Sequence, residues 1–197
     1  MFTGIIRELG TITGVSRRGG LIRLLVAAPQ LAVQVEPLES IAVNGACLSV
    51  VAVRPPELTF EIIRETQGLT TLGALRRGGR VNLEPSLTLA DRLNGHVVLG
   101  HVDGVGTITR RRDADGQRVL DIRVDRRLGA WLVPKGPVAL EGVSLTVGGR
   151  VTPTAFSVHL IPETLRRTTL QDRGPGDRVN VELDYVAKVL RRRRAAR

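Results

Sequence analysis

The sequence predicts an all-β protein: two similar six-stranded antiparallel Greek-key β-barrels, produced by tandem duplication, followed by a C-terminal helix. Short motifs recur in the same order in the two halves of the chain. Each half also consists mainly of short, β-branched, partly alternating segments separated by Gly, Pro and Asp. An apolar stripe near the end of the chain predicts the helix.

Four pairs of motifs support the duplication. The pairs are Gly4 with Gly100 (and GTI at 10–12 with 106–108), NGACLSV at 44–50 with EGVSLTV at 141–147, RETQGLTTL at 64–72 with PETLRRTTL at 162–170, and GGRVNLE at 78–84 with GDRVNVE at 176–182. The offsets of 96, 97 and 98 residues keep one order along the chain. Collinear repeats of this kind predict that the two halves share one fold.

The expected strands include residues 21–28, 40–53, 58–65 and 80–84 in the first half, and 104–111, 118–125, 137–149 and 156–163 in the second. Hairpin turns are expected at 17–20, 54–57 and 113–117. Closure of each sheet into a barrel would remove its exposed edges. The predicted domains are 1–96 and 97–184, joined near 89–95.

Helices are expected at matching places in the two halves. One begins near Glu65 and near Glu163, and another follows each Val-Asn-x-Glu strand. At the end of the chain, residues 185–197 form a predicted oligomerisation helix with a basic tail. Its apolar stripe, Leu183, Val186, Val189 and Leu190, should pack on the barrel or on neighbouring subunits.

Composition narrows the class of protein. The chain has 197 residues, no run of eighteen apolar residues and no signal-like start, so we expect a soluble cytoplasmic protein that is not bound to a membrane. One cysteine, Cys47, excludes an internal disulfide. The net charge of +10 falls to +4 without the six cations of the last ten residues, which fits a solvated helix end as well as an anion-binding tail.

Several kinds of chemistry do not fit the sequence. Cys47 stands alone, and His96, His101 and His159 lack the tight spacing of metal ligands. The segment 142–149 lacks the G-x-S-x-G hydrolase motif, and the glycine-rich segment 94–106 lacks the Lys-Ser/Thr ending of a phosphate-binding loop. The sequence therefore predicts neither a metal nor a nucleotide cofactor.

The repeated strand motif places two small polar residues on one face in each half. Cys47 and Ser49 share a face in the first copy, as Ser144 and Thr146 do in the second. A single copy would fit a barrel face filled with small side chains. Two copies, each near a repeated Thr-Thr-Leu, favour a face that binds a flat polar ligand.

Five segments resemble riboflavin synthases of the α-chain type, which contain two lumazine-binding repeats. They are MFTGI (1–5), NGACLSV (44–50), GHVVLGHVDGVG (95–106), KGPVALEGVSLTV (135–147) and VTPTAFSVHLIPETLRRTTL (151–170). The resemblance implies a dismutation of two 6,7-dimethyl-8-ribityllumazine molecules to riboflavin and 5-amino-6-ribitylamino-uracil, without a cofactor. It also implies a homotrimer in which the N-terminal barrel of one subunit faces the C-terminal barrel of its neighbour, and an association with lumazine synthase.

The resemblance also implies the site residues. The catalytic set is Phe2, Thr3, Ser40, Cys47, His101, Ser144 and Asp184. The substrate-binding set is Gly4, Ile5, Ile6, Cys47, Leu48, Ser49, Glu61, Ile62, Ile63, Arg64, Glu65, Thr66, Gly100, His101, Val102, Lys135, Ser144, Leu145, Thr146, His159, Leu160, Ile161, Pro162, Glu163 and Thr164. In the segments 4–6, 61–66, 100–102 and 159–164 the implied contacts come from backbone groups, which suit a ring with alternating donors and acceptors.

Individual positions refine this assignment. His101 aligns with Ile5, so this histidine is present in one repeat only, and its side chain suits proton transfer near neutral pH. His96 and His159 fit structural roles. The adjacent cysteines of the family are reduced here to Ala46 and Cys47, and the role of Cys47 as acid, nucleophile or polar contact stays open.

Two other functions fit parts of the sequence. A non-enzymatic lumazine- or flavin-binding protein of the antenna type would use the same barrels, but such proteins depart from the family at active-site residues that this chain keeps. A nucleic-acid-binding pair of barrels would need stacking aromatic residues, and 3% aromatic content cannot supply them. We therefore expect no nucleic-acid partner.

Overall fold

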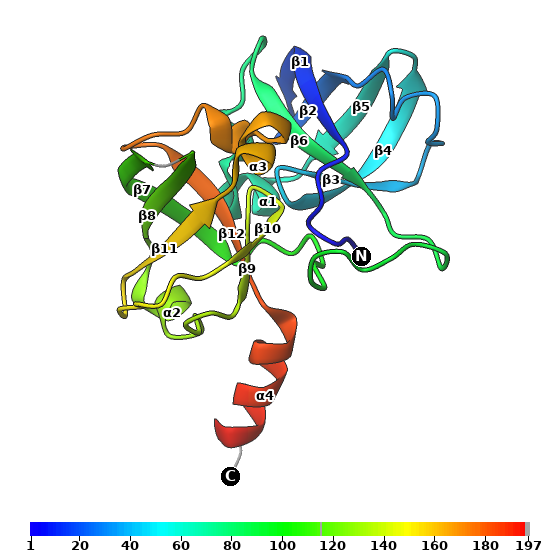
Figure 1. Ribbon diagram of the computed structural model, residues 1–197. Coiled ribbons are helices and arrows are strands. Elements are labelled where there is room, and N and C mark those ends of the chain that lie inside the picture. Colours follow the sequence, from blue (N-terminus) through cyan, green and yellow to red (C-terminus); the bar gives the residue numbers. More distant parts are fainter. Residues whose placement is uncertain (115, 196–197) are drawn as a thin grey trace.

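The first half of the chain forms a closed barrel of six antiparallel strands (Figure 1). The strands are β1 Glu8–Arg18, β2 Leu21–Ala27, β3 Ser40–Val43, β4 Ala46–Arg54, β5 Glu57–Ile62 and β6 Arg80–Pro85. They pair in the order β1-β2-β5-β4-β3-β6, and β6 pairs back with β1, as in a Greek key. The computed structural model describes the backbone of residues 1–114 and 116–195 and the side chains up to residue 190.

The second half repeats this strand order. Its strands are β7 Gly104–Ala114, β8 Gln117–Arg123, β9 Pro137–Leu140, β10 Val143–Thr146, β11 Ala155–Leu160 and β12 Arg178–Leu183. They pair in the order β10-β9-β12-β7-β8-β11, and a single bridge between Val147 and Val158 joins the two ends. Gly148 and Gly149 follow β10 where β4 of the first barrel continues, and glycine weakens a strand. The two ends of the second sheet are therefore joined over a shorter length than those of the first barrel.

Two segments that we expected as single strands, 40–53 and 137–149, are each divided by a two-residue turn. Asn44 and Gly45 have φ of 46° and 82°, and Glu141 and Gly142 have φ of 50° and 78°. Two consecutive residues with positive φ are typical of a type I′ turn, whose twist matches that of the flanking strands.

The predicted helices are confirmed except in one place. Helix α1, Arg64–Leu69, and its repeat α3, Pro162–Arg167, are each followed by a 3₁₀ turn, η1 Thr71–Ala74 and η2 Thr169–Gln171. A short helix α2, Arg126–Gly129, follows β8. The helix expected after β6 is absent, because residues 86–100 run as turns and extended chain toward the second barrel. The prediction of a helix there was wrong.

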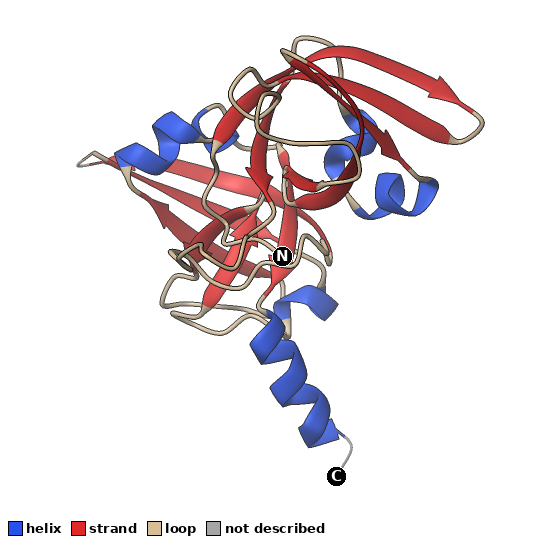
Figure 2. Cartoon of the chain, turned by 90° about the vertical axis from the view of Figure 1, so that its right-hand side faces the viewer, coloured by secondary structure: helices blue, strands red, loops and turns tan. Residues whose placement is uncertain are grey.

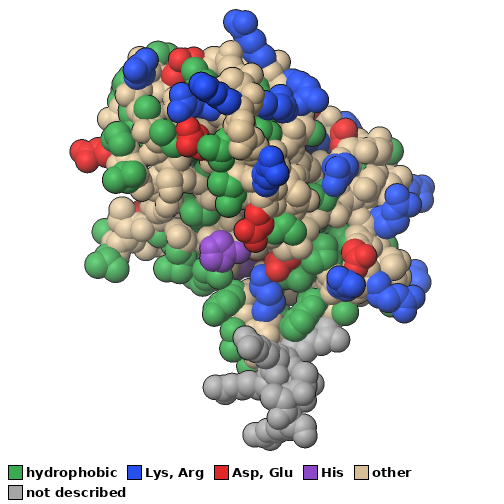
Figure 3. Space-filling view, turned by 180° about the vertical axis from the view of Figure 1, so that it is seen from behind, with side chains coloured by type: hydrophobic (Ala, Val, Ile, Leu, Met, Phe, Trp, Pro, Cys, Tyr) green, Lys and Arg blue, Asp and Glu red, His purple; other side chains and the backbone are tan. Residues whose placement is uncertain are grey.

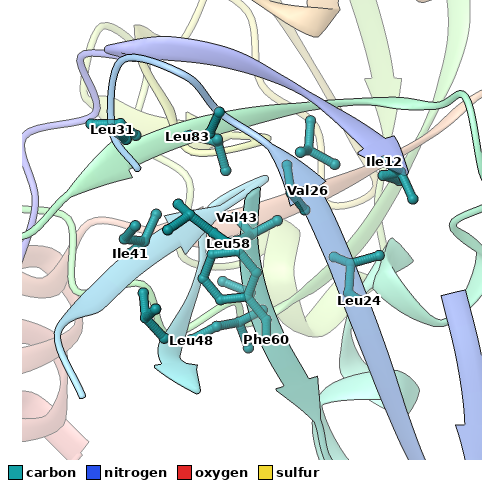
Figure 4. Packing of buried hydrophobic residues seen from close by; sticks show 14 of the residues in the cluster. Ile12, Leu24, Val26, Leu31, Ile41, Val43, Leu48, Leu58, Phe60 and Leu83 are labelled. Atoms are coloured by element: carbon teal, nitrogen blue, oxygen red, sulfur yellow. The ribbon is translucent and has the colours of Figure 1, made fainter. Parts of the chain in front are cut away.

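Each barrel has its own apolar core. In the N-terminal barrel, Phe60 is fully buried among Leu24, Leu58, Leu83 and other aliphatic side chains (Figure 4). Burying one such side chain contributes about 1.5–3 kcal/mol. The core therefore supplies stability while the outer faces of the strands remain free for other contacts.

The two barrels meet at an approximate two-fold axis marked by the repeated asparagines of β6 and β12. The Nδ2 of Asn82 donates to the carbonyl of Glu141, and the Nδ2 of Asn180 donates to the carbonyl of Asn44, both at 2.8 Å. Their Oδ1 atoms accept from backbone N–H groups of the opposite repeat at 2.7 Å. The side chain of each repeated Asn thus binds the opposite repeat, while its backbone belongs to its own barrel.

Helix α4, Tyr185–Ala195, projects away from both barrels (Figures 1 and 2). Asp184 accepts hydrogen bonds from the N–H groups of Val186 and Ala187, and Lys188 forms an ion pair with Asp103 at 2.7 Å. The expected apolar stripe needs one correction: Leu183 ends β12 and is buried in the C-terminal core. The arginine side chains of the basic tail lie outside the described residues.

Candidate active site

Two segments cross between the barrels, and we call them straps: residues 2–6, which lead toward β1, and residues 98–102, which lead toward β7. The straps pair with each other through the backbone of Phe2 and Val98, with N–H···O distances of 2.7 and 3.0 Å. Phe2 is fully buried there, against Ala42 and Ala139 from the two barrels. The crossing point is therefore a packed part of the structure.

Beyond the crossing point, each strap lies against the opposite barrel. The carbonyl of Gly4 accepts a hydrogen bond from the N–H of Ser144 at 2.8 Å, and the carbonyl of Gly100 accepts one from the N–H of Cys47 at 2.9 Å. Both glycines have φ of 78°, a conformation that favours glycine. A Cβ at either position would lie 2.6 Å from the Cβ of the serine or the cysteine. The straps thus contact the two candidate sites directly.

The Cys47 site is a cavity of about 270 Å³ on the outside of the N-terminal barrel. Leu48 and Val50 of β4 face the barrel core, so Cys47 and Ser49 face outward. The cavity is lined by Ala46, Cys47, Glu65, Thr66, Leu69, Thr70, Gly100, His101 and Val102. The structure thus brings together Cys47 and His101, which are far apart in sequence. The strap 98–102 carries this histidine from the second repeat to the first barrel.

The Ser144 site has a different histidine. His96 Nδ1 lies 2.7 Å from Ser144 Oγ, and one of the two atoms donates to the other according to the imidazole tautomer. Burial lowers the pKa of His96, and the nearby negative charge of Asp184 opposes this shift in part. A neutral imidazole can accept a hydrogen bond from the serine hydroxyl, whose oxygen then remains free to accept a hydrogen bond from a ligand. The sequence prediction assigned His96 to structure, so this contact was missed.

Two buried carboxylates hold the straps. Glu84 of β6 accepts from Thr3 N–H and from Thr3 Oγ1 at 2.7 Å, and from Gly4 N–H at 3.0 Å. Glu182 of β12 accepts from Leu99 N–H at 2.7 Å and from Gly100 N–H at 3.0 Å. Burial raises the pKa of both glutamates, and these hydrogen bonds oppose the increase.

Three predicted catalytic residues, Thr3, Ser40 and Asp184, lie outside the Cys47 cavity. Ser40 pairs with Ser49 in the β3–β4 ladder, and Ser40 and Thr3 line a larger cavity of about 800 Å³ beside the 28–38 turn and the linker after β6. Asp184 caps α4 and acts on the Ser144 site through its charge near His96. None of these three residues lines the Cys47 cavity.

Five predicted binding residues direct their side chains into the barrel cores, so only their backbone groups can face a ligand. These residues are Ile6, Leu48, Ile62, Leu145 and Leu160. Recognition of a ligand through the backbone of the segments 4–6, 61–66, 100–102 and 159–164 stays a prediction.

The remaining predicted residues lie on the outer surface or near it. Ser49, Ile63, Arg64, Lys135, Thr146, His159, Ile161 and Pro162 are exposed, whereas Ile5 and Thr164 are half-buried. Glu61 pairs with Arg23 at 2.8 Å, and Glu163 pairs with Arg166 and Arg167. Lys135 has φ of 64° and lies outside the Cys47 cavity.

The two glutamates that hold the straps were also missed, although a signal for them was present. Both occupy the last position of the repeated Arg-Val-Asn-x-Glu motif, and a carboxylate repeated inside a buried strand needs a partner. The partner could not be found from the sequence, because the chain segment that it binds crosses from one barrel to the other.

The described residues limit what else the protein could bind. Among them, no group of three or more His, Cys, Asp or Glu side chains is placed to hold a metal ion. No helix in the described part of the chain is long and apolar enough to cross a membrane. On the face shown in Figure 3, the Lys and Arg side chains are interspersed with acidic and apolar ones rather than gathered in one patch.

Comparisons with known proteins agree with this architecture. The lumazine binding domain family matches residues 3–86 and 99–184. The chain is 41% identical over 195 residues to the riboflavin synthase of Mycobacterium tuberculosis (strain ATCC 25618 / H37Rv), covering 98% of this chain and 97% of the relative. It is 37% identical over 192 residues to the riboflavin synthase of Bacillus subtilis (strain 168), covering 98% and 89%.

Solved structures show the same fold. LumP complexed with riboflavin has a TM-score of 0.87 and 24% identity, covering 93% of this chain and 99% of that chain. LumP complexed with 6,7-dimethyl-8-(1'-D-ribityl) lumazine has a TM-score of 0.83, with 92% and 98% covered. Two lumazine binding domains in tandem, with identity to known enzymes over nearly the full length, establish that the chain belongs to the riboflavin synthase family.

Proposed function

We propose that the protein is a riboflavin synthase that converts two molecules of 6,7-dimethyl-8-ribityllumazine into riboflavin and 5-amino-6-ribitylamino-uracil. One observation supports this most strongly: Cys47 and Ser144 occupy equivalent positions in the two repeats, but the groups beside them differ. Cys47 lies in a cavity with His101, whereas Ser144 contacts His96. Two related sites with unlike groups suit a reaction in which two copies of one substrate have different fates.

The two sites would act mainly by positioning. One lumazine donates a four-carbon unit to the other, and holding two rings in one reactive arrangement can be worth an effective molarity of about 10⁵ M or more. Histidine suits the removal of a proton from the lumazine 7-methyl group, and we assign this role to His101 because it lines the Cys47 cavity. The ring itself absorbs the resulting negative charge.

We further propose that the reacting pair forms between subunits of a cytoplasmic homotrimer, with the N-terminal barrel of one subunit facing the C-terminal barrel of its neighbour. Apolar side chains on α4, including Val186 and Leu190, are exposed in the single chain, which supports assembly through this helix. An association with lumazine synthase stays a prediction.

A binding protein of the antenna type is the second candidate, because LumP shares the fold. Such a protein would bind lumazine or riboflavin without converting one into the other. Cys47 and His101 face one cavity in this chain, which favours the enzyme.

Incubation of the purified protein with the lumazine alone tests the proposal. Riboflavin fluorescence should appear after exhaustive chelation, with one riboflavin formed per two lumazines consumed. Binding without turnover would support the antenna function, and dependence on an added metal or on NADPH would contradict the proposed mechanism.

A further inference from the structure

The two strap-holding glutamates are arranged crosswise. Glu84 belongs to the N-terminal barrel, but the strap that it holds lies against Ser144 of the C-terminal barrel. Glu182 belongs to the C-terminal barrel, but its strap lies against Cys47 of the N-terminal barrel. Each carboxylate accepts from two successive backbone N–H groups, the second of which belongs to the glycine that touches the site.

This geometry leaves little freedom in the position of each strap. The glycine carbonyl is bonded to the N–H of Ser144 or Cys47, while the glycine N–H is bonded to the carboxylate. The peptide groups on both sides of the glycine are therefore fixed: one is bonded to the carboxylate of one barrel, and the other to a backbone N–H of the other barrel. Hydrogen bonds to an ionised carboxylate are stronger than those between neutral groups, and both glutamates are almost fully buried.

We propose that Glu84 and Glu182 are positioning residues, each of which completes the ligand site of the barrel to which it does not belong. Glu84 sets the strap 2–6 at the Ser144 site, and Glu182 sets the strap 98–102, with His101, at the Cys47 site. The inference deepens the proposed function by naming the residues that build each lumazine site. It predicts that one substitution weakens one site, and that the weakened site lies on the opposite barrel.

The single cysteine allows a site-specific measurement. Cys47 lines its cavity and is partly exposed, so the rate of its alkylation by iodoacetamide reports on that site alone. The variants are Glu84→Gln and Glu182→Gln, with Glu182→Asp as a second variant that keeps the charge but shortens the reach. Glu8→Gln is the matched control, because Glu8 is a buried carboxylate that accepts from two successive N–H groups, those of Gln30 and Leu31, and these belong to the N-terminal half rather than to a strap.

Without any ligand, Glu182→Gln should increase the alkylation rate of Cys47, because a neutral amide holds the strap that covers it less firmly than a carboxylate does. Glu84→Gln and Glu8→Gln should leave this rate close to that of the wild type. In Glu182→Gln, protection of Cys47 from alkylation should need a riboflavin concentration at least about 10-fold higher than in the wild type. In Glu84→Gln, Cys47 protection should be unchanged while the total riboflavin bound per chain decreases.

Three results would overturn the proposal: loss of Cys47 protection in Glu84→Gln with retention in Glu182→Gln, equal loss in both, or equal loss in Glu8→Gln. The ligand-free arm separates this proposal from the proposed function. If the wild type bound no riboflavin and formed none from lumazine, the proposed function would fail. A selective increase of Cys47 alkylation in Glu182→Gln and Glu182→Asp would still support the crosswise arrangement of the straps.

Discussion

Cys47 and Ser144 occupy equivalent positions in the two repeats, and each has a histidine near it that the other repeat lacks. His101 reaches Cys47 on the strap 98–102, whereas His96 contacts Ser144 from the linker between the barrels. Duplication alone would have produced two like sites. Because the histidines come from segments outside the equivalent strands, the sites differ in chemistry while their β-scaffolds stay alike.

His96 gives a prediction at the residue scale. Burial lowers the pKa of His96 below its ordinary value of 6.5, so the unfolded chain takes up a proton more readily than the folded protein as the pH falls below 6.5. The free energy of unfolding should therefore decrease as the pH falls through this range. In His96→Asn, which cannot titrate, this part of the decrease should be absent.

Urea unfolding of both proteins from about pH 7.5 to pH 5 measures the difference. Burial raises the pKa of Glu84 and Glu182, so these groups contribute the opposite slope, stabilising the folded protein as the pH falls toward their range. Their contribution is common to both proteins and cancels. Parallel stability curves for the wild type and His96→Asn would contradict the assignment.

At the scale of elements, α4 projects away from both barrels. Asp184 caps its first turn and Lys188 ties it to Asp103. Val186 and Leu190 remain 54% and 61% exposed. An apolar helix face that its own chain does not cover is expected to pack against a neighbour. Hydrophobic side chains also lie beside the start of this segment in Figure 3.

We expect Val186→Asp with Leu190→Asp to yield monomers whose barrels stay folded but whose activity is lost. Burying each of these side chains is worth roughly 1.5–3 kcal/mol, and a carboxylate in their place would oppose association. Deletion of residues 192–197 is the matched control, and it should leave a trimer with near-normal activity because a run of like charges adds little to association. Sedimentation and the riboflavin assay decide between the outcomes; an active trimer from the double variant would refute the role of α4.

At the scale of the whole molecule, the two repeats contact each other reciprocally through equivalent residues. Asn82 and Asn180 donate to equivalent turns of the opposite repeat, and Glu84 and Glu182 hold equivalent straps. A single repeat therefore contains its own Asn, Glu, turn and strap. It lacks only the equivalent groups that the other repeat would place against it.

This symmetry predicts the behaviour of the fragment 1–96. All strands of the closed barrel lie within it, so it should fold. It lacks Gly100 and His101, and in a dimer the strap 2–6 of one copy could take the place of the strap 98–102 on Cys47 of the other. We expect the fragment to form dimers that bind riboflavin but turn over lumazine poorly or not at all. A monomer with full activity in sedimentation and turnover assays would contradict both the symmetry argument and the proposed pairing of unlike sites.

Much of the architecture could be predicted from the sequence because the repeats and the strand patterns are local signals. The Asn44-Gly45 dipeptide is a strong type I′ hairpin signal that the prediction missed, whereas Glu141-Gly142 carries no such signal. Leu183 was assigned to the helix because its spacing fits an apolar stripe, but strand and helix patterns overlap where β12 meets α4.

The sequence allowed candidate site residues to be named, but not the contacts that these residues make between the barrels. Alignment of the repeats relates Gly4 to Gly100, but it cannot show that each glycine lies against the opposite barrel. The contact between His96 and Ser144 joins residues 48 positions apart and has no counterpart in the first repeat. Such contacts depend on how the barrels are arranged, and no periodic pattern within one segment reports that arrangement.

The glycines of the two type I′ turns, Gly45 and Gly142, lie against each other where the repeats meet, and this contact couples the two halves. A Cβ on Gly45 would lie 2.6 Å from the backbone nitrogen of Gly142, and one on Gly142 would lie 2.8 Å from that of Gly45. Any side chain at either position would therefore press on the backbone of the opposite repeat, so a substitution in one half would disturb both. The two halves differ at Cys47 and Ser144, whereas at this point of contact each glycine leaves no room for a side chain on the other.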